Sequence, residues 1–371
     1  MRPTSCKSTR GFSLMEMLVA MSLGLLLVGS AVQMYSKATD ATFMVSQRAQ
    51  MQQDLRAAEN MMTKDISLSG AGLQPGGIAL VSGTGSNPKY GCDQVKCYIG
   101  GGTTPAGIAF PNNYLYWIIP GPARGITLNA ARGATDVITV VYADSAFQLN
   151  QYQATFNNAN GTSVNFTLPN PAPNPLPQAV SAPDVGLKTG DLVLFTNTVG
   201  GNTAMAVGEV TANVTGANSP YTALFANADA LLFNQTAANA GGMKQIAGGA
   251  NTTAVRIVVV TYYLDVLPDP TGVGPGSPRL MRQVNGQPPS PVAENIADLQ
   301  ITYDTYDNAG NLLVDQADAG AAVGVLPNMI RKVNLKHLTA RSAMHGTKGF
   351  QSMDVETSIS ARNMSFKDRY Q

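Results

Sequence analysis

The organisation of this chain is decided by residues 11–32, GFSLMEMLVAMSLGLLLVGSAV. Glu16 is the only ionisable side chain in this apolar stretch. A helix of this length spans ~30 Å, about the hydrocarbon thickness of a bilayer. A charged side chain near the bilayer centre costs roughly 2.5–3.5 kcal/mol on insertion scales, so a single intramembrane carboxylate suggests a functional partner. The stretch therefore predicts a membrane span in which one charged side chain, Glu16, has a functional partner.

The residues before the span predict its orientation. Arg2, Lys7 and Arg10 stand there without any acidic residue. Positively charged flanks stay in the cytoplasm, so the rest of the chain should face outward.

Three ordinary explanations compete for the same segment. A cleaved secretory signal would end in small residues, and Gly29, Ser30 and Ala31 could serve as such a site. A plain signal anchor explains the span but leaves Glu16 unexplained. A core helix of a soluble enzyme would need a polar face, which residues 12–32 almost entirely lack.

Residues 11–16, GFSLME, resemble the processing motif of type IV pilins and pseudopilins. The resemblance implies that a membrane aspartyl peptidase cuts after Gly11 and that the new N-terminal Phe12 is methylated. Glu16 would then be the fifth residue of the mature chain. The basic leader, the glycine, the aromatic residue and the glutamate at this spacing make the motif specific.

Physical chemistry gives Glu16 a role in assembly. After the cut, Phe12 carries a free amine at the tip of an apolar helix. The Glu16 carboxylate of a neighbouring subunit could neutralise this amine where an unpaired charge of either sign is disfavoured. Such a pair forms only if the two helices are offset by about one turn, so Glu16 would set the axial register of a filament.

We expect one long helix to continue beyond the membrane. Residues 34–70 carry a Met-rich stripe at three- and four-residue steps, which should pack against a sheet. Its members are Ala41, Met44, Met51, Leu55, Ala58, Met62 and Ile66. Proline is absent from residues 12–74, so any bend near Gln33 should be slight, and Gly70 to Gly72 should end the helix.

The remainder reads as antiparallel β structure, giving an α+β fold. Gly and Pro total 37 and 22, and charged residues are only 13%, which suits an exported, loop-rich β protein. Short β-branched and aromatic runs predict strands at residues 114–119, 136–142, 191–196, 204–210, 254–264, 279–283, 298–304, 330–340 and 353–362. Residues 212–251 read as a long polar loop with a short helix at 221–233.

The C-terminal third is similar to one branch of the pilin family, the PilW-type minor pilins. The phrases are VRIVVVTYYLD, PRLMRQVNG and VAENIADLQITYD within residues 255–304, followed by LKHLTARS and ISARNMS. The middle of the chain looks like the long insertion of larger PilW members. The predicted domains are a cleaved leader at 1–11, a span at 12–33, an amphipathic helix half at 34–70, and a β-rich domain at 71–371 with an inserted β region at about 125–250.

Cysteine usage agrees with export. Cys6 belongs to the predicted leader, which leaves Cys92 and Cys97 as a pair that could close a small loop by a disulfide in an oxidising periplasm. Two free thiols are the alternative. His337 and His345 offer no recognised zinc-ligand spacing with them, so we assign no metal site.

No motif for catalysis stands out, so we assign no catalytic residue and no cofactor. The acid- and amide-rich residues 304–311 resemble a calcium loop, but the EF-hand spacing is missing and a hairpin turn is the better interpretation. The net charge of +1 gives no reason to expect a nucleic-acid partner.

These observations predict a non-enzymatic minor type IV pilin that helps to initiate assembly and lies sparsely at or near the pilus tip. Its expected partners are other minor and major pilins, the prepilin peptidase and the inner-membrane assembly platform. It would cross the inner membrane of a Gram-negative-type bacterium once, with a cytoplasmic N-terminus, and then reach the cell surface. The alternatives are a minor pseudopilin of type II secretion, a tip adhesin or DNA-uptake receptor, and a membrane-tethered enzyme.

Overall fold

The structure of the 371-residue chain is a computed structural model. It describes residues 11, 13–81, 88–92, 97–100, 114–227, 229–236, 241–270, 276–318, 325–343 and 349–364. For residues 90–92, 97–100 and 343 it describes the backbone alone. Most of the predicted leader, including Cys6, and the predicted mature first residue Phe12 therefore lie outside the described residues.

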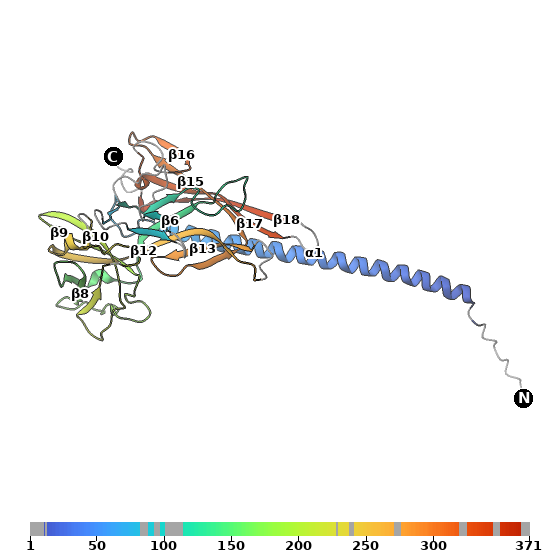
Figure 1. Cartoon of the computed structure of the whole chain (residues 1–371), viewed down its shortest axis with the longest axis horizontal. Helices are drawn as coiled ribbons and strands as arrows, with labels where there is room; N and C mark the ends of the chain where they lie inside the picture. Colours follow the sequence, from blue (N-terminus) through green and yellow to red (C-terminus); the bar gives the residue numbers. More distant parts are fainter. Residues whose placement is uncertain are drawn as a thin grey trace, which may run out of the picture.

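A single uninterrupted helix, α1 (Leu14–Leu68), forms the N-terminal part of the molecule (Figure 1). Its 55 residues make a rod of about 80 Å. The helix passes Gln33 without a break, as the absence of proline predicted. It ends at the C-cap Ser69, directly before the predicted stop at Gly70.

The end of α1 is fastened to strand β6 (Val137–Ala143) by backbone hydrogen bonds. The Gly70 N–H donates to the Val141 carbonyl at 2.8 Å, and the Ala143 N–H donates to the Ala71 carbonyl at 2.9 Å. Gly70 has a φ of +74°, and a Cβ there would lie 3.0 Å from Cδ1 of Trp117. Both the backbone conformation and the close contact require glycine at this position.

The largest sheet has seven strands in the order β10-β9-β12-β13-β14, with β6 paired to β12 and β5 paired to β6. The bounds are β5 (Ile118–Gly121), β9 (Leu192–Val199), β10 (Asn202–Glu209), β12 (Ala250–Leu267), β13 (Ser277–Val284) and β14 (Ser290–Glu294). Strand β12 is 18 residues long, and its first half pairs with β9 whereas its second half pairs with β6 and β13.

A second sheet of four strands has the order β16-β15-β17-β18. Its strands are β15 (Ile296–Tyr306), β16 (Leu312–Gln316), β17 (Ile330–Ala343) and β18 (Phe350–Ser360). A third sheet has the order β11-β8-β7, from β7 (Gln153–Phe156), β8 (Ser163–Thr167) and β11 (Tyr221–Leu224). The small pairs are β1 (Ile78–Ala79) with β4 (Tyr114–Leu115) and β2 (Lys89–Cys92) with β3 (Cys97–Gly100). Short helices are η1 (Leu149–Gln151), α2 (Met243–Ile246), η2 (Pro327–Met329) and η3 (Arg362–Met364).

The C-terminal half of α1 lies between the two larger sheets and forms part of their shared core. Met51, Leu55, Ala58, Met62 and Ile66 are buried there, together with side chains of β6, β12, β15 and β17. The predicted stripe therefore packs as expected from Met51 onward, but Ala41 is exposed and does not join it.

Every strand pair in the named sheets is antiparallel, so the predicted α+β architecture is confirmed. The strand predicted at residues 114–119 is instead split between β4 and β5, which belong to different sheets. Strands β1, β2, β3, β7, β8, β14 and β16 were not predicted. The turn between β15 and β16 confirms the hairpin interpretation of residues 304–311.

The region between β6 and β12 has a hydrophobic core of its own. It contains Phe166, Phe195, Phe225, Met243 and Ile246 among other buried side chains. The predicted helix at 221–233 is wrong, because Tyr221 to Leu224 form β11 and bury alternate residues against β8. The predicted polar loop at 212–251 is likewise wrong in part, since it supplies β11, α2 and several core side chains.

Candidate functional site

The N-terminal end of α1 holds the carboxylate that the sequence singled out. The Glu16 N–H donates to Ser13 Oγ at 3.2 Å, and the Ser13 N–H donates to Glu16 Oε2 at 3.1 Å. This reciprocal arrangement is a capping box, which satisfies two donors that a helix start leaves unpaired. Glu16 therefore stabilises its own helix in the unprocessed chain. Gly11 is exposed beside it.

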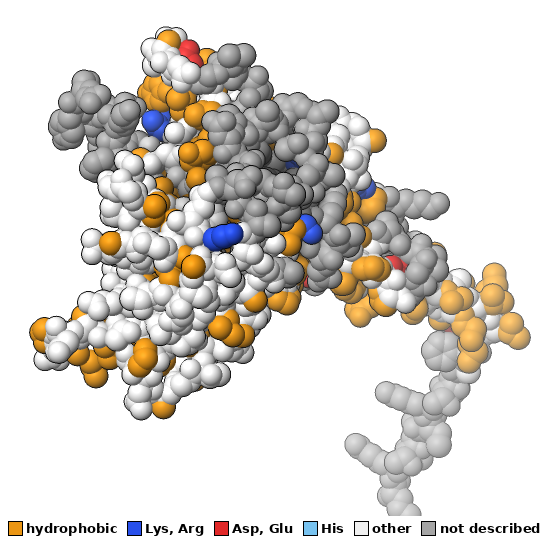
Figure 2. Space-filling view, turned by 60° about the vertical axis from the view of Figure 1, so that its left-hand side comes forward, with side chains coloured by type: hydrophobic (Ala, Val, Ile, Leu, Met, Phe, Trp, Pro, Cys, Tyr) orange, Lys and Arg blue, Asp and Glu red, His pale blue; other side chains and the backbone are white. Residues whose placement is uncertain are grey.

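The first half of α1 exposes its apolar side chains to the surroundings. Leu14 is 82% exposed, Leu25 74% and Val32 61%. Figure 2 shows hydrophobic side chains gathered on the part of the helix that projects from the globular body. By length and composition, this is the one helix in the described part of the chain that could cross a membrane. Such a surface is stable only in lipid or against other apolar helices.

The second half of α1 is attached to the sheet by a buried carboxylate. Asp65 is 1% exposed and accepts hydrogen bonds from the Tyr262 hydroxyl at 2.6 Å, the Arg282 Nε at 2.7 Å and the Tyr142 hydroxyl at 3.1 Å. These three donors come from β12, β13 and β6, so one side chain joins the helix to three strands.

The groups around Asp65 are held in fixed protonation states. Burial and the adjacent Asp65 raise the pKa of the Tyr262 and Tyr142 hydroxyls well above the ordinary value. Burial alone would lower the pKa of Arg282, but its hydrogen bond and charge interaction with Asp65 raise that pKa overall. The arrangement is a fully hydrogen-bonded ion pair rather than a proton-transfer site.

The place where α1 enters the globular body is marked by side-chain contacts with β18. Arg48 Nε donates to Gln351 Oε1 at 3.2 Å, and Gln351 Nε2 donates to Gln47 Oε1 at 3.1 Å. From Leu14 to this point the helix projects for about 50 Å. That length exceeds the ~30 Å of a bilayer core, so a stretch of exposed helix separates the predicted span from the globular body.

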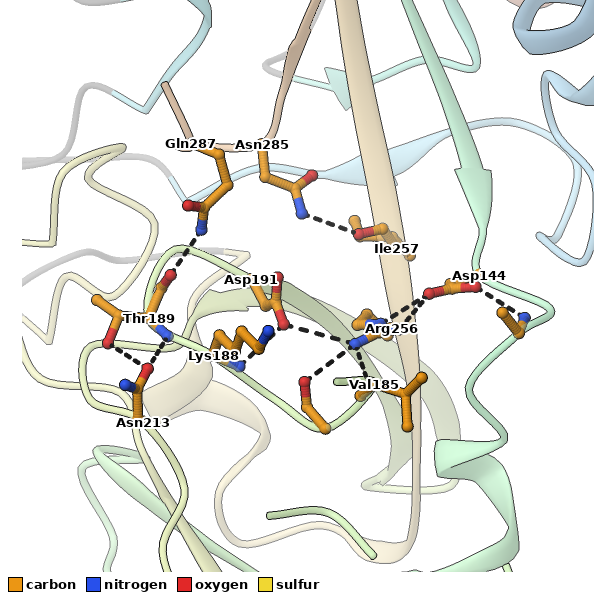
Figure 3. Close-up of polar contacts among 12 residues, drawn as sticks. Asp144, Val185, Lys188, Thr189, Asp191, Asn213, Arg256, Ile257, Asn285 and Gln287 are labelled. Atoms are coloured by element: carbon orange, nitrogen blue, oxygen red, sulfur yellow. Dashed lines mark hydrogen bonds and ion pairs between the residues drawn. The ribbon is translucent and has the colours of Figure 1, made fainter. Parts of the chain in front are cut away.

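A polar cluster joins the chain between β6 and β9 to strand β12 (Figure 3). Arg256 Nε donates to Asp144 Oδ2 at 2.8 Å, and Arg256 Nη1 donates to the Val185 carbonyl at 2.7 Å and lies 3.6 Å from Asp191 Oδ2. Burial raises the pKa of Asp191, and the Lys188 backbone N–H and the Arg256 charge oppose that effect. Arg256 precedes Ile257, the residue at which β12 changes partners from β9 to β6. The cluster therefore fixes the position at which β12 passes from β9 to β6.

Strands β2 and β3 place Cys92 directly opposite Cys97 in an antiparallel pair. Opposed residues in such pairs have Cα atoms about 4.5–5.5 Å apart, within the range that a disulfide bridges. The described part of the two residues is the backbone, so the disulfide stays a prediction.

Polar groups that could suggest catalysis are arranged differently from a nucleophile–base pair. His337 Nδ1 lies 2.7 Å from Asp354 Oδ2, and Thr339 Oγ1 donates to the other Asp354 oxygen at 2.9 Å. The hydroxyl and the imidazole thus both bind the carboxylate rather than each other. In the β15–β16 turn, Asp307 accepts from the backbone of Ala309 and Asn311, as a capped turn does.

Three of these features were not predicted from the sequence. The Ser-x-x-Glu spacing from Ser13 to Glu16 is the usual signal of a capping box. Asp65 stands next to Ile66 within an otherwise apolar helix face, which is a signal of a buried carboxylate with partners. Arg256 is a lone charge in the apolar run VRIVVVTYYL. Its partner Asp144 lies more than a hundred residues earlier in the sequence, and its partner Asp191 more than sixty.

Comparison with known proteins supports the N-terminal part of this picture. Residues 6–32 match the family described as the prokaryotic N-terminal methylation motif. No curated protein and no solved structure matches the chain. The motif indicates a type IV pilin-like or pseudopilin precursor, and proteins of this kind are structural rather than enzymatic. It implies processing by a prepilin peptidase and assembly with other pilins in a membrane system. Together with the apolar helix, it is consistent with anchoring in the inner membrane.

Proposed function

We propose that this protein is a minor type IV pilin, a structural subunit that helps to initiate pilus assembly and is incorporated sparsely at or near the pilus tip. One observation carries the proposal: a single helix exposes its apolar N-terminal half, which bears the methylation motif, and buries its C-terminal half in a β-rich body. The PilW-like phrases near the C-terminus support the choice of a minor subunit.

The proposed maturation follows from the motif. The peptidase removes residues 1–11 by cutting after Gly11, and Phe12 becomes the methylated first residue. Residues 12–33 span the inner membrane, residues 34–70 continue the helix, and residues 71–371 form the periplasmic body with an inserted region at about 125–250. The basic leader keeps the N-terminus cytoplasmic.

In this scheme the Glu16 carboxylate has two alternative partners, one in the precursor and one in the filament. In the precursor it accepts a hydrogen bond from the Ser13 N–H. In a filament it would instead accept the Phe12 amine of a neighbouring subunit, which is a stronger, charge-assisted partner in an apolar medium. Docking therefore exchanges a local cap for an intersubunit ion pair.

Three variants separate the charge of Glu16 from its capping role. Glu16→Gln keeps the capping box, because glutamine also fits its last position, but removes the charge. Glu16→Ala removes both, and Ser13→Ala removes the cap while keeping the charge. We expect all three to be processed, Ser13→Ala to enter sheared filaments, and the two Glu16 variants to be absent from them. Normal incorporation of Glu16→Gln would show that the charge is not needed.

Mass spectrometry of sheared filaments tests the maturation itself. The expected N-terminal peptide begins at an N-methylated Phe12. Recovery of a chain that still carries residues 1–11 would refute the proposal.

A minor pseudopilin of a type II secretion system is the second candidate, because the motif is shared by both classes. Co-purification of the protein with sheared surface pili distinguishes the two classes. A pilin is expected in sheared surface pili, whereas a pseudopilin is expected to remain with the envelope fraction and its loss would block secretion of exoproteins.

A further inference from the structure

Strand β17 ends and strand β18 begins where α1 enters the globular body (Figure 1). A cleft of about 270 Å³ lies there. Gln351 contacts α1, and its neighbour Ser352 lines the cleft, so the cleft lies on the sheet face that looks away from the helix. It is called the entry cleft here, and its lining includes Leu128, Arg132, Asp298, Arg341, Phe350 and Ser352.

Arg341 gives the entry cleft a positive charge that is open to a ligand. Its guanidinium lies 3.7 Å from the centre of the Phe350 ring, which is itself 52% exposed. Among the residues that the structure describes, no carboxylate lies within ion-pair distance of Arg341. The ring contact holds the guanidinium in place and leaves its N–H donors available.

The second arginine of the cleft is paired, but with an acid that is itself hidden from solvent. Arg132 Nη1 lies 2.9 Å from Asp298 Oδ2, and Asp298 is only 4% exposed whereas the Arg132 side chain is 38% exposed. Farther along β18, Asp354 is occupied by the Thr339 hydroxyl and by His337. The surface of the cleft therefore carries a positive charge beside an exposed aromatic ring.

The membrane-spanning half of α1 decides which surface this cleft can meet. The proposed span ends at residue 33, about 20 Å along the helix from Gln47, which contacts β18. The same helix therefore holds the cleft beside a bilayer at a high effective concentration.

The tilt of α1 sets whether the cleft reaches the lipid headgroups, which form a layer of about 5–7 Å on each side of the hydrocarbon. An upright helix would hold Arg341 above this layer. The sheet packs about 10 Å to one side of α1, and the Arg341 side chain extends farther. A tilt of about 30–40° toward that side, within the range seen for membrane helices, brings the guanidinium to the headgroups.

We propose that the entry cleft binds the headgroup phosphates of anionic phospholipids in the membrane that holds α1, so that the subunit leans on the bilayer before assembly. Arginine binds phosphate by paired N–H donors, and basic side chains beside aromatic ones are typical of surfaces at a membrane interface. Each basic residue near an anionic surface favours binding about fivefold. The proposal rests on the span and orientation of the proposed function and adds a lipid partner for the globular body.

The test uses the full-length chain in nanodiscs of phosphatidylcholine alone or of phosphatidylcholine with phosphatidylglycerol. Hydrogen exchange is followed by mass spectrometry in peptides that cover residues 350–354. We expect this segment to exchange about fivefold or more slowly in the anionic nanodiscs, because the headgroups cover it. The β9–β10 hairpin, at the far end of the body, should exchange equally in both (Figure 1). Salt at about 0.5 M should remove the difference.

Two cleft variants and one control complete the design. Arg341→Gln and Phe350→Ser should each reduce the effect of phosphatidylglycerol about fivefold. Both side chains are exposed, so neither change empties the core. Lys244→Gln removes an exposed positive charge from α2 and should behave as the native chain does.

Flotation with vesicles of phosphatidylcholine separates this proposal from the proposed function. A chain that fails to float would refute the membrane span itself. A chain that floats, but exchanges equally in neutral and anionic nanodiscs, would overturn only the lipid contact. The lipid contact is also overturned if Arg341→Gln keeps the full effect, or if residues 350–354 become protected only when another pilin is added.

Discussion

At the scale of single residues, Asp65 makes the attachment of the helix to the sheet depend on one carboxylate. Breaking a buried ion pair by removing one partner costs about 3–5 kcal/mol, because the other charge stays buried without compensation. Removing the Asp65 carboxylate would leave Arg282 and the hydroxyls of Tyr262 and Tyr142 without their hydrogen-bond acceptor.

We expect Asp65→Ala to lower the free energy of unfolding of the globular body by about 3–5 kcal/mol. Thermal unfolding in detergent measures the change. Lys64→Ala, at an exposed neighbour on the same helix, should have little effect. The double variant Asp65→Leu with Arg282→Met, which removes both charges, should recover much of the loss, and a double variant as unstable as Asp65→Ala would contradict this explanation.

A second residue-scale feature is a pair of buried acids at the end of β10. Glu209 is 3% exposed and Asp229 is 5% exposed. Burial, a hydrogen bond from one carboxyl group to the other, and the Asp229 charge raise the pKa of Glu209 to about 8. Burial also raises the pKa of Asp136 to about 6, against the opposing hydrogen bonds from the Ala123 and Ile301 N–H groups.

These raised pKa values make stability fall as pH rises. The folded protein holds both protons more tightly than the unfolded chain, so the stabilising contribution is complete below the ordinary pKa of about 4. It is lost as pH rises through about 6 for Asp136 and about 8 for Glu209. We expect Tm to drop by a few degrees between about pH 5 and about pH 9.

Glu209→Gln should flatten this pH dependence, because the amide replaces the protonated carboxyl group as a donor to Asp229. Glu356→Gln, on the exposed side of β18, should keep the native slope. A Glu209→Gln slope equal to that of the native chain would show that the acid pair does not control it.

At the scale of elements, the long helix and the strands β9 and β10 were predictable, whereas the small sheet β11-β8-β7 was not. Spacing of Met51, Leu55 and Met62 identified the buried helix face, since a 3.6-residue period survives in the sequence alone. Strands β7 and β11 escaped prediction because each is only four residues long, QATF and YTAL, too short to show a clear alternating pattern. Both strands pair with β8 and bury side chains in a core that also contains Phe195 of β9, a contact that only the folded chain supplies.

The same contrast holds for the candidate site. Glu16 was predictable because a charge in an apolar span is a local signal. The Asp65 and Arg256 clusters were not, because their partners come from strands that only the folded sheet brings together. A cleft beside the C-terminal end of α1 is likewise lined by residues that range from Pro75 to Met364.

The β2–β3 hairpin gives a prediction at this scale. A disulfide between Cys92 and Cys97 would close a small loop, for which chain-entropy arguments give about 2 kcal/mol of stabilisation. We expect the mature protein from the periplasm to contain no thiol that reacts with maleimide under denaturing conditions until it is reduced. Two reactive thiols in the unreduced protein would refute the disulfide.

At the scale of the whole molecule, the exposed helix half and the globular body require different surroundings. We expect the native chain in the inner-membrane fraction, with the body digested by protease added to spheroplasts. A chain that begins at residue 34 behind a cleavable signal should be recovered in the soluble periplasm. Protection of the body in intact spheroplasts would contradict the proposed orientation.

The way α1 lies in the body also sets how it would bear force. The helix runs lengthwise against β14, β17 and β18 instead of ending at their surface (Figure 1). In the proposed filament, tension along the fibre would enter through the apolar half of α1 and act parallel to this contact, so it would load the buried side chains and the Asp65 ion pair together in shear. Such a joint yields only when many contacts fail at once.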